Sequence, residues 1–119
     1  MSSKLQISTT FKIAEGKLEK FKQLAIECMN QVKEKDTGTL RYDWFISSDL
    51  AECEVHEEYE SSEAVFQHMM NLNQVLTKLL KEFPMDRVAV YGDPSPQLLK
   101  LLKSNKTLGV KLYSFFQGL

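Results

Sequence analysis

The sequence predicts an α+β fold whose elements follow the order strand, helix, strand, strand, helix, strand. Segments 38–46 and 53–59 alternate apolar and polar residues with the period of a β-strand, and a short polar turn joins them. Segments 4–13 and 87–91 show similar alternation on either side of this hairpin. Two long segments between these strands repeat apolar residues at the spacing of an α-helix. This order is that of the ferredoxin-like split βαβ fold.

Composition places the chain among ordinary globular domains. Its 119 residues fit one domain, and 43% of them are apolar and 26% charged. The net charge of −1 gives no electrostatic support for nucleic-acid binding. Apolar runs are too short to span a bilayer and no apolar signal region follows Met1, so we expect a cytoplasmic protein that binds no membrane. The two cysteines, Cys28 and Cys53, lie outside any Cys-x-x-Cys pair, which favours buried thiols over a disulfide or zinc site.

The N-terminal part is predicted to form an amphipathic strand followed by an amphipathic helix. In segment 4–13 the alternate apolar positions share one face, which predicts a strand buried on one side. From residue 15 the period becomes helical. Asp36, Thr37 and Gly38 end this helix. The helical stripe consists of Leu18, Phe21, Leu24, Ala25, Cys28, Met29 and Val32.

The two central strands predict a specific register. Register is set by keeping the apolar faces of both strands on one side of the sheet. The reverse face then gains two charge-complementary pairs, each of which contributes about 0.2–1 kcal/mol. The predicted pairs are Trp44–Val55, Ile46–Cys53, Asp43–His56 and Arg41–Glu58.

The C-terminal half predicts a helix, a strand and an extension. Ser61 is the predicted N-cap of the helix, Asn71 and Asn73 are expected to break or bend it, and Pro84 closes the segment. After the strand 87–91, segment 97–103 predicts a short helix and segment 109–116 a fifth, aromatic strand. We therefore divide the chain into a core domain, residues 1–93, and an extension, residues 94–119. The extension packs on the same domain or on a partner chain.

Part of this pattern resembles the antibiotic biosynthesis monooxygenase domain, which quinol monooxygenases share. The resemblance covers residues 5–93, and the segment after Pro96 departs from the minimal family pattern. The histidine follows the phenylalanine one residue earlier than in that family. The residues that carry the resemblance are Gly38-x-Leu40-x-Tyr42 and, after a turn, Glu58-Tyr59-x-Ser61-x-Glu63-Ala64-x-Phe66-x-His68.

The resemblance implies a homodimer in which two sheets face each other as an α+β barrel. Each protomer would hold a pocket between its sheet and its helices. Catalytic members of the family oxidise phenolic, quinol or polyketide substrates with O₂ and use no flavin, haem or metal, because the deprotonated substrate supplies the electrons. We therefore expect no cofactor, and a small aromatic molecule and O₂ as ligands.

His68 and Trp44 are the expected catalytic residues. A histidine with a reference pKa of about 6.5 accepts a phenolic proton at neutral pH. The alternative is a polar residue at the edge of the helix with no particular partner. Trp44 lies on the strand face that should look toward the helices, where offset stacking on a flat substrate contributes about 0.5–1.5 kcal/mol. Core packing explains that position equally well.

Glu57 is the acidic residue on the apolar face of its strand. Burial among apolar neighbours would raise the pKa of this carboxyl group and make it a base near neutrality, whereas at a wet strand end it would reach solvent. The expected substrate-binding residues are Tyr42, Val55, Glu57, Phe66 and Met69.

The reverse face of the hairpin predicts a dimer interface, because charges between two facing sheets must be paired. Its residues are Arg41, Asp43, His56 and Glu58. No two histidines have the spacing of a metal site on one helix face, so no metal is expected.

Two functions from different classes remain open on the sequence alone. One is a cofactor-independent monooxygenase that acts on a small aromatic, quinol-like substrate. The other is a non-catalytic dimeric barrel that binds a hydrophobic ligand or a partner protein through segment 98–116. An exposed extension would favour the second function.

Overall fold

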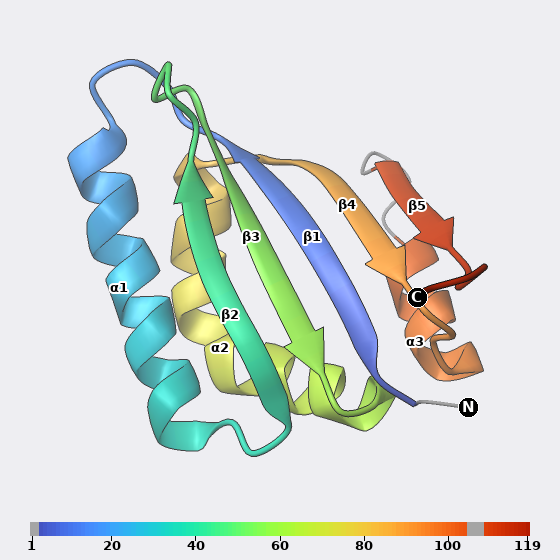
Figure 1. Ribbon diagram of the computed structural model, residues 1–119. Coiled ribbons are helices and arrows are strands. Elements are labelled where there is room, and N and C mark those ends of the chain that lie inside the picture. The colour runs from blue at the N-terminus through green and yellow to red at the C-terminus, as the bar shows by residue number, and fades with distance from the viewer. Residues whose placement is uncertain (1–2, 105–108) are drawn as a thin grey trace.

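The elements follow the predicted order and confirm the ferredoxin-like α+β fold. The computed structural model describes residues 3–104 and 109–119 (Figure 1). The elements are β1 Leu5–Lys12, α1 Leu18–Lys35, β2 Thr39–Ile46, β3 Glu52–Tyr59, α2 Ser62–Glu82, β4 Met85–Tyr91, α3 Pro96–Lys103 and β5 Gly109–Tyr113.

The five strands form one sheet in the order β2-β3-β1-β4-β5. β1 lies at its centre and pairs antiparallel with β3 and β4. β5 pairs in parallel with β4, so the extension completes the sheet of its own chain. Helix α3 is anchored by Leu98, which is fully buried, and by the Ser95 N–H, which donates to Ser62 Oγ at 2.9 Å.

The register of the hairpin is the predicted one, and the charge-complementary residues lie opposite each other as predicted. All four predicted pairs are register partners. The charges pair along their own strands instead: Arg41 Nε lies 2.6 Å from Asp43 Oδ2, and His56 Nε2 lies 2.6 Å from Glu54 Oε1. Side chains at i and i+2 share one face of a strand, so these neighbours compete with the partners opposite.

Two boundaries also differ from expectation. Helix α2 continues through Asn71 and Asn73, so the predicted break is wrong. The buried side chains of Leu72, Val75 and Leu79 hold this part of the helix on the core, and tertiary packing outweighs local propensity. Strand β5 ends at Tyr113, and the predicted strand residues beyond it lie in an irregular, exposed tail.

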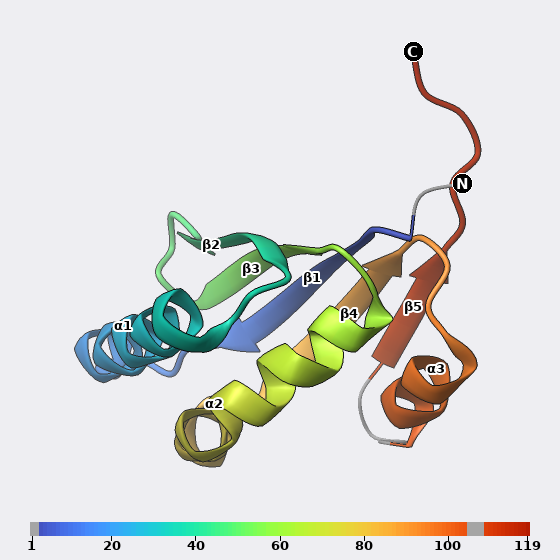
Figure 2. The same cartoon turned by 90° about the horizontal axis from the view of Figure 1, so that it is seen from below.

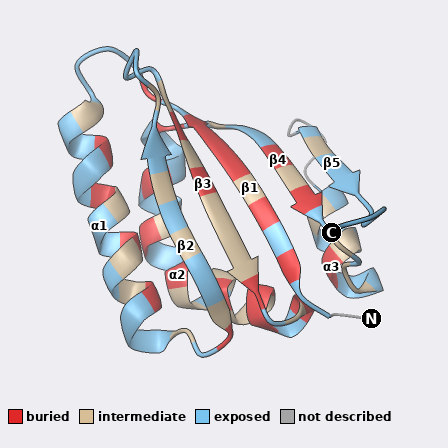
Figure 3. Cartoon of the chain, in the orientation of Figure 1, coloured by how far each residue is buried: buried red, intermediate tan, exposed pale blue. Residues whose placement is uncertain are grey.

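All three helices cover one face of the sheet and leave the other bare (Figure 2). The buried apolar residues accordingly lie between helices and sheet, whereas much of β2 is exposed (Figure 3). Both cysteines are buried free thiols. None of the described helices has the length and apolar character needed to cross a membrane.

Candidate functional site

A cavity of about 290 Å³ lies on the helix-facing side of the sheet. Strands β1 to β4 form its floor, and helices α2 and α3 form its walls. Most of its surface is aliphatic or aromatic, the usual character of a small-molecule site. The polar side chains in its lining are Thr9, Tyr42, Glu57, Tyr59, His68 and Ser104.

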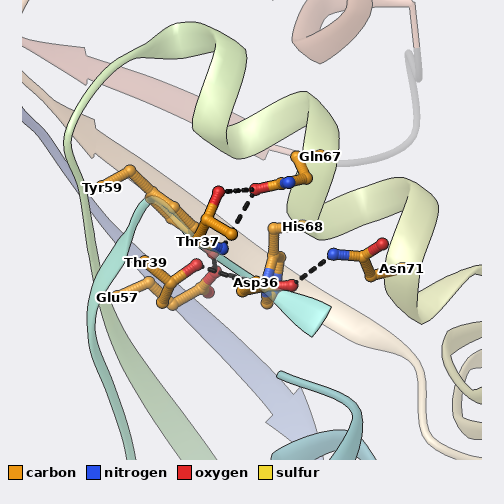
Figure 4. Close-up of polar contacts among 8 residues, drawn as sticks. All are labelled: Asp36, Thr37, Thr39, Glu57, Tyr59, Gln67, His68 and Asn71. Atoms are coloured by element: carbon orange, nitrogen blue, oxygen red, sulfur yellow. Dashed lines mark hydrogen bonds and ion pairs between the residues drawn. The ribbon is translucent and has the colours of Figure 1, made fainter. Parts of the chain in front are cut away.

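His68 lies in this lining as one member of a buried pair. Its Nδ1 is 2.7 Å from Asp36 Oδ2, and the two side chains are 8% and 1% exposed (Figure 4). Because a carboxylate only accepts, Nδ1 carries the proton and donates, which leaves the lone pair of a neutral imidazole on Nε2. The rings of Tyr42 and Tyr59 pack edge-on against the imidazole, with ring centroids 5.0 and 5.2 Å from its centroid. These contacts fix the orientation of the imidazole.

Asp36 reaches His68 because the turn after α1 packs tightly on α2. Gly38 permits this approach, since a Cβ at that position would lie 2.6 Å from the Cβ of Ala64. Thr37 fastens the same turn, because its N–H and hydroxyl both donate to Gln67 Oε1. The C-cap of one helix is thereby placed against the side of another.

Three donors surround the Asp36 carboxylate. Asn71 Nδ2 donates to Oδ1 at 2.7 Å, and Thr39 Oγ1 and His68 Nδ1 donate to Oδ2 at 2.6 and 2.7 Å. Burial alone would raise the pKa of Asp36, but these hydrogen bonds outweigh burial and lower the pKa below its ordinary value. Asp36 is therefore an anion at neutral pH, with its charge held next to the imidazole.

Glu57 faces His68 from strand β3. Its pKa is shifted upward, in the direction opposite to that of Asp36. Its Oε1 lies 3.8 Å from His68 Nε2, and its side chain is only 11% exposed. Thr9 Oγ1 donates to Oε2 at 3.0 Å, and the Tyr59 hydroxyl donates to Oε1. Burial raises the pKa of Glu57, and this effect exceeds the lowering by His68 and by the two hydroxyl donors.

Trp44 packs against the core and also lines the cavity. Its ring stacks on Phe11 at 6.1 Å and meets Tyr42 edge-on at 5.5 Å. Its Nε1–H is buried and has no hydrogen-bond partner among the described residues. A buried donor without a partner is destabilising by about 1–3 kcal/mol, so it favours a ligand that brings an acceptor.

Most of the expected site residues meet at the cavity. His68, Trp44, Tyr42, Val55, Glu57 and Met69 line it. Phe66 does not; it lies half-buried against a second core cluster around Leu5 and Tyr59. Arg41, Asp43, His56 and Glu58 lie on the bare face of the sheet. There a second hollow, of about 240 Å³, is lined by Arg41, Glu54, His56 and Glu58 among others.

The residues that support His68 and Glu57 are not evident from the sequence. Its local pattern indicates only that Asp36 ends a helix and that Asn71 disfavours one. One signal was available, because Asn71 follows His68 by three residues and therefore lies on the same side of the helix. Within residues 3–104 and 109–119, no group of three or more His, Cys, Asp and Glu side chains is arranged to hold a metal ion.

Comparisons with known proteins place this fold. MupZ from Pseudomonas fluorescens superposes with a TM-score of 0.81 at 17% identity, over 100% of this chain and 90% of that chain. A variant of SnoaB, a cofactor-independent oxygenase from Streptomyces nogalater, gives a TM-score of 0.67 at 9% identity, over 79% of this chain and 96% of that chain. A comparison with curated protein sequences found no match. The profile of the antibiotic biosynthesis monooxygenase family matches residues 6–74, more than half of the sequence, and the chain therefore belongs to that family.

Proposed function

We propose that this protein is a cofactor-independent monooxygenase that oxidises a small aromatic, quinol-like substrate with O₂. Membership of the family supports the reaction class. The observation that carries the proposal is the buried His68–Asp36 pair in the lining of an apolar, aromatic cavity. A base placed among apolar walls suits a substrate that must lose a proton before it reacts.

In this proposal His68 takes the first proton. Hydrogen bonding of Nδ1 to Asp36 directs the Nε2 lone pair at the substrate. The resulting phenolate or enolate is electron-rich and reduces O₂. In an anthrone-like substrate a CH₂ group becomes C=O, and the second oxygen atom leaves as water. The protein supplies the base, the orientation of the ring and the exclusion of water.

The aromatic wall holds the ring of the substrate. Tyr42 and Trp44 present their rings from strand β2, and Met69 and Val55 complete an apolar surface around them. The Trp44 Nε1–H then donates to an oxygen of the substrate, which satisfies the donor that the free protein leaves without a partner.

Helix α3 limits the length of the substrate. Leu101, Leu102 and Ser104 line the cavity, although they lie outside the segment that matches the family profile. The extension also presents exposed apolar side chains, which supports a partner-binding surface as the second candidate function. They are Leu101, Leu112, Tyr113, Phe115 and Phe116. We expect Leu102→Ala to admit tetracyclic substrates and Leu102→Trp to exclude tricyclic ones.

The test is oxygen uptake with a panel of naphthoquinols and anthrone, compared with autoxidation in buffer. We expect turnover of at least one compound, with one oxygen atom recovered in the product from ¹⁸O₂. Trp44→Phe should raise KM by about 10-fold, the loss of one good hydrogen bond. The matched control is Phe45→Leu, which changes a neighbouring aromatic on the bare face. Uptake no faster than buffer across the whole panel would refute the oxygenase.

We also propose that two copies pair through the bare face of the sheet. That face carries Arg41, Asp43, His56 and Glu58, and the tail leaves β5 toward the same side (Figure 2). Phe115 and Phe116 are 81% and 93% exposed there, which is unusual for aromatic side chains in a single chain. Analytical ultracentrifugation should show a dimer for the parent and a weaker dimer for a Phe115→Ser, Phe116→Ser variant. A monomeric parent would exclude this pairing.

A further inference from the structure

Two ionisable groups, His68 and Glu57, face each other in the cavity. His68 has its proton fixed on Nδ1 by the Asp36 carboxylate, so Nε2 is a proton acceptor. Glu57 is buried, and burial raises its pKa, so the carboxyl group keeps its proton to higher pH than an ordinary glutamate does. A proton acceptor and a carboxyl group that keeps its proton can act together as a base and an acid when they lie side by side.

The separation of the two groups suits adjacent atoms of one functional group. His68 Nε2 and Glu57 Oε1 are 3.8 Å apart. The α-carbon and the oxygen of a ketone are about 2.4 Å apart, given a C–C bond of about 1.52 Å and a C=O bond of about 1.23 Å. A ketone lying beside the pair therefore presents its α-hydrogen to one group and its oxygen to the other.

We propose that the cavity also catalyses an oxygen-independent reaction, the keto–enol isomerisation of a bicyclic or tricyclic aryl ketone, with His68 as base, Glu57 as acid and Asp36 as the residue that positions His68. The reaction uses the cavity of the proposed oxygenase but needs neither O₂ nor any other oxidant.

The proton and electron movements balance within the substrate and the two side chains. His68 Nε2 removes the α-proton, and the C–H electron pair becomes the new C=C bond. The carbonyl π pair moves to oxygen, which receives the Glu57 proton. The imidazolium then returns its proton to the glutamate, because a movement of about 1 Å brings the two atoms to hydrogen-bond distance.

The surroundings favour the charge that develops in this reaction. Oxygen becomes negative in a wall of aliphatic and aromatic side chains, where a directed hydrogen bond is stronger than it is in water. Thr9 and Tyr59 each donate to Glu57, and they stabilise its anion after the proton has left. The same two donors hold the carboxyl group toward the cavity.

The experiment measures exchange of α-hydrogens for deuterium under argon, by NMR in D₂O buffer, with 1-tetralone and with 2-tetralone. Binding is followed by quenching of Trp44 fluorescence, since Trp44 is the single tryptophan and lines the cavity. We expect the protein to accelerate exchange of a bound ketone at least 100-fold over buffer. Exchange no faster than buffer at saturation, or failure of both ketones to bind, would overturn the isomerase.

Variants separate the three roles. His68→Gln should abolish the acceleration, and Glu57→Gln should reduce it by about 10²–10³-fold, as the loss of one oxyanion donor does. Asp36→Asn should lower kcat by about 10–100-fold and leave KM within twofold, because it disturbs the orientation of the base rather than the binding of the ring. An unchanged kcat in Asp36→Asn would remove the positioning role. The matched control is Glu82→Gln, which changes a surface carboxylate that pairs with Lys20. This variant should catalyse deuterium exchange of the ketone at the parental rate.

The outcomes also separate this activity from the oxygenase. Exchange under argon without oxygen uptake in air would support the isomerase and refute the oxygenase. Oxygen uptake without exchange would do the reverse. Both rates falling together in His68→Gln would show that one base serves both reactions.

Discussion

Two histidine–carboxylate pairs have nearly equal N···O distances, but one is buried and the other is exposed. His68 and Asp36 lie 2.7 Å apart with side chains 8% and 1% exposed, whereas His56 and Glu54 lie 2.6 Å apart with side chains 38% and 44% exposed. The first pair lies under helix α2 at an apolar cavity, and the second lies on the bare face of the sheet. Distance alone does not distinguish them.

Burial and additional partners are what separate the two pairs. An exposed pair is screened by water and typically contributes about 0–1 kcal/mol. In the buried pair Asn71 and Thr39 also donate to the carboxylate, and two tyrosine rings orient the imidazole. The same chemistry is therefore a surface contact in one place and a fixed, directed base in the other.

The largest effect should come from removing each imidazole in turn. We expect His68→Ala to lower kcat/KM for anthrone oxidation by about 10²–10⁴-fold, the usual contribution of a general base. His56→Ala should stay within twofold of the parent at a protein concentration where both are dimers. The measurement is oxygen uptake on variants whose circular dichroism matches the parent. Equal losses in both variants would mean that the buried position has no special role.

The carboxylates should differ in stability. We expect Asp36→Asn to lower the free energy of unfolding at pH 7 by about 1.5–3 kcal/mol, because the carboxylate accepts three charge-assisted hydrogen bonds. Glu54→Gln should cost under about 1 kcal/mol. The pKa of Asp36 is lowered, so its stabilisation is present above the unfolded pKa and is lost as pH falls through the folded one. Urea denaturation at pH 7 and pH 3 tests both points. The difference in free energy of unfolding between Asp36→Asn and Glu54→Gln should be smaller at pH 3, and an unchanged difference would contradict the prediction.

Gly38 should be needed to build the buried pair. We expect Gly38→Ala to destabilise the protein by about 1–3 kcal/mol, because the new methyl group overlaps Ala64 and displaces the turn that carries Asp36. The matched control is Gly109→Ala, where no described atom lies within 4 Å of the added methyl group. Thermal unfolding compares the two. A stable Gly38→Ala protein with parental activity would show that the turn tolerates a shift.

The smallest effect should be a pH dependence from Glu57. Because burial raises the pKa of Glu57, the folded state binds this proton more tightly than the unfolded state does. Its contribution to stability is therefore fullest below the ordinary pKa of about 4.3 and is lost as pH rises toward the folded pKa. Between pH 4 and pH 8, the free energy of unfolding of Glu57→Gln should rise by about 1–2 kcal/mol relative to that of the parent. Glu58→Gln, on the bare face, should show no such relative rise. Parallel pH profiles for parent and Glu57→Gln would contradict the raised pKa.

Much of the fold was predictable because it depends on local period and face. Alternation fixed the strands, and keeping Trp44 and Val55 on one face was enough to predict the register of the hairpin. The helix break expected at Asn71 is absent because of a tertiary contact. Local propensity disfavours asparagine in a helix, but here the Asn71 side chain donates a hydrogen bond to Asp36.

The site was predictable only where its residues lie on regular faces. His68, Trp44, Tyr42 and Glu57 share the helix-facing side, and the cavity brings them together. Asp36 lies in a turn, where no period indicates direction, and its placement depends on a contact between Gly38 and Ala64. The extension was ambiguous in the same way, because nothing in the spacing of leucines shows that Leu101 and Leu102 face a cavity.

The central position of β1 has a consequence for synthesis of the protein on the ribosome. Gln6 pairs with Glu58 on one side and with Tyr91 on the other, so β1 lies between two strands that are made later. At about 5–20 residues per second, the 85 residues that follow Gln6 up to Tyr91 take about 4–17 s to add. Until β4 has been added, one or both edges of β1 have unpaired backbone groups that chaperones and other nascent chains can reach.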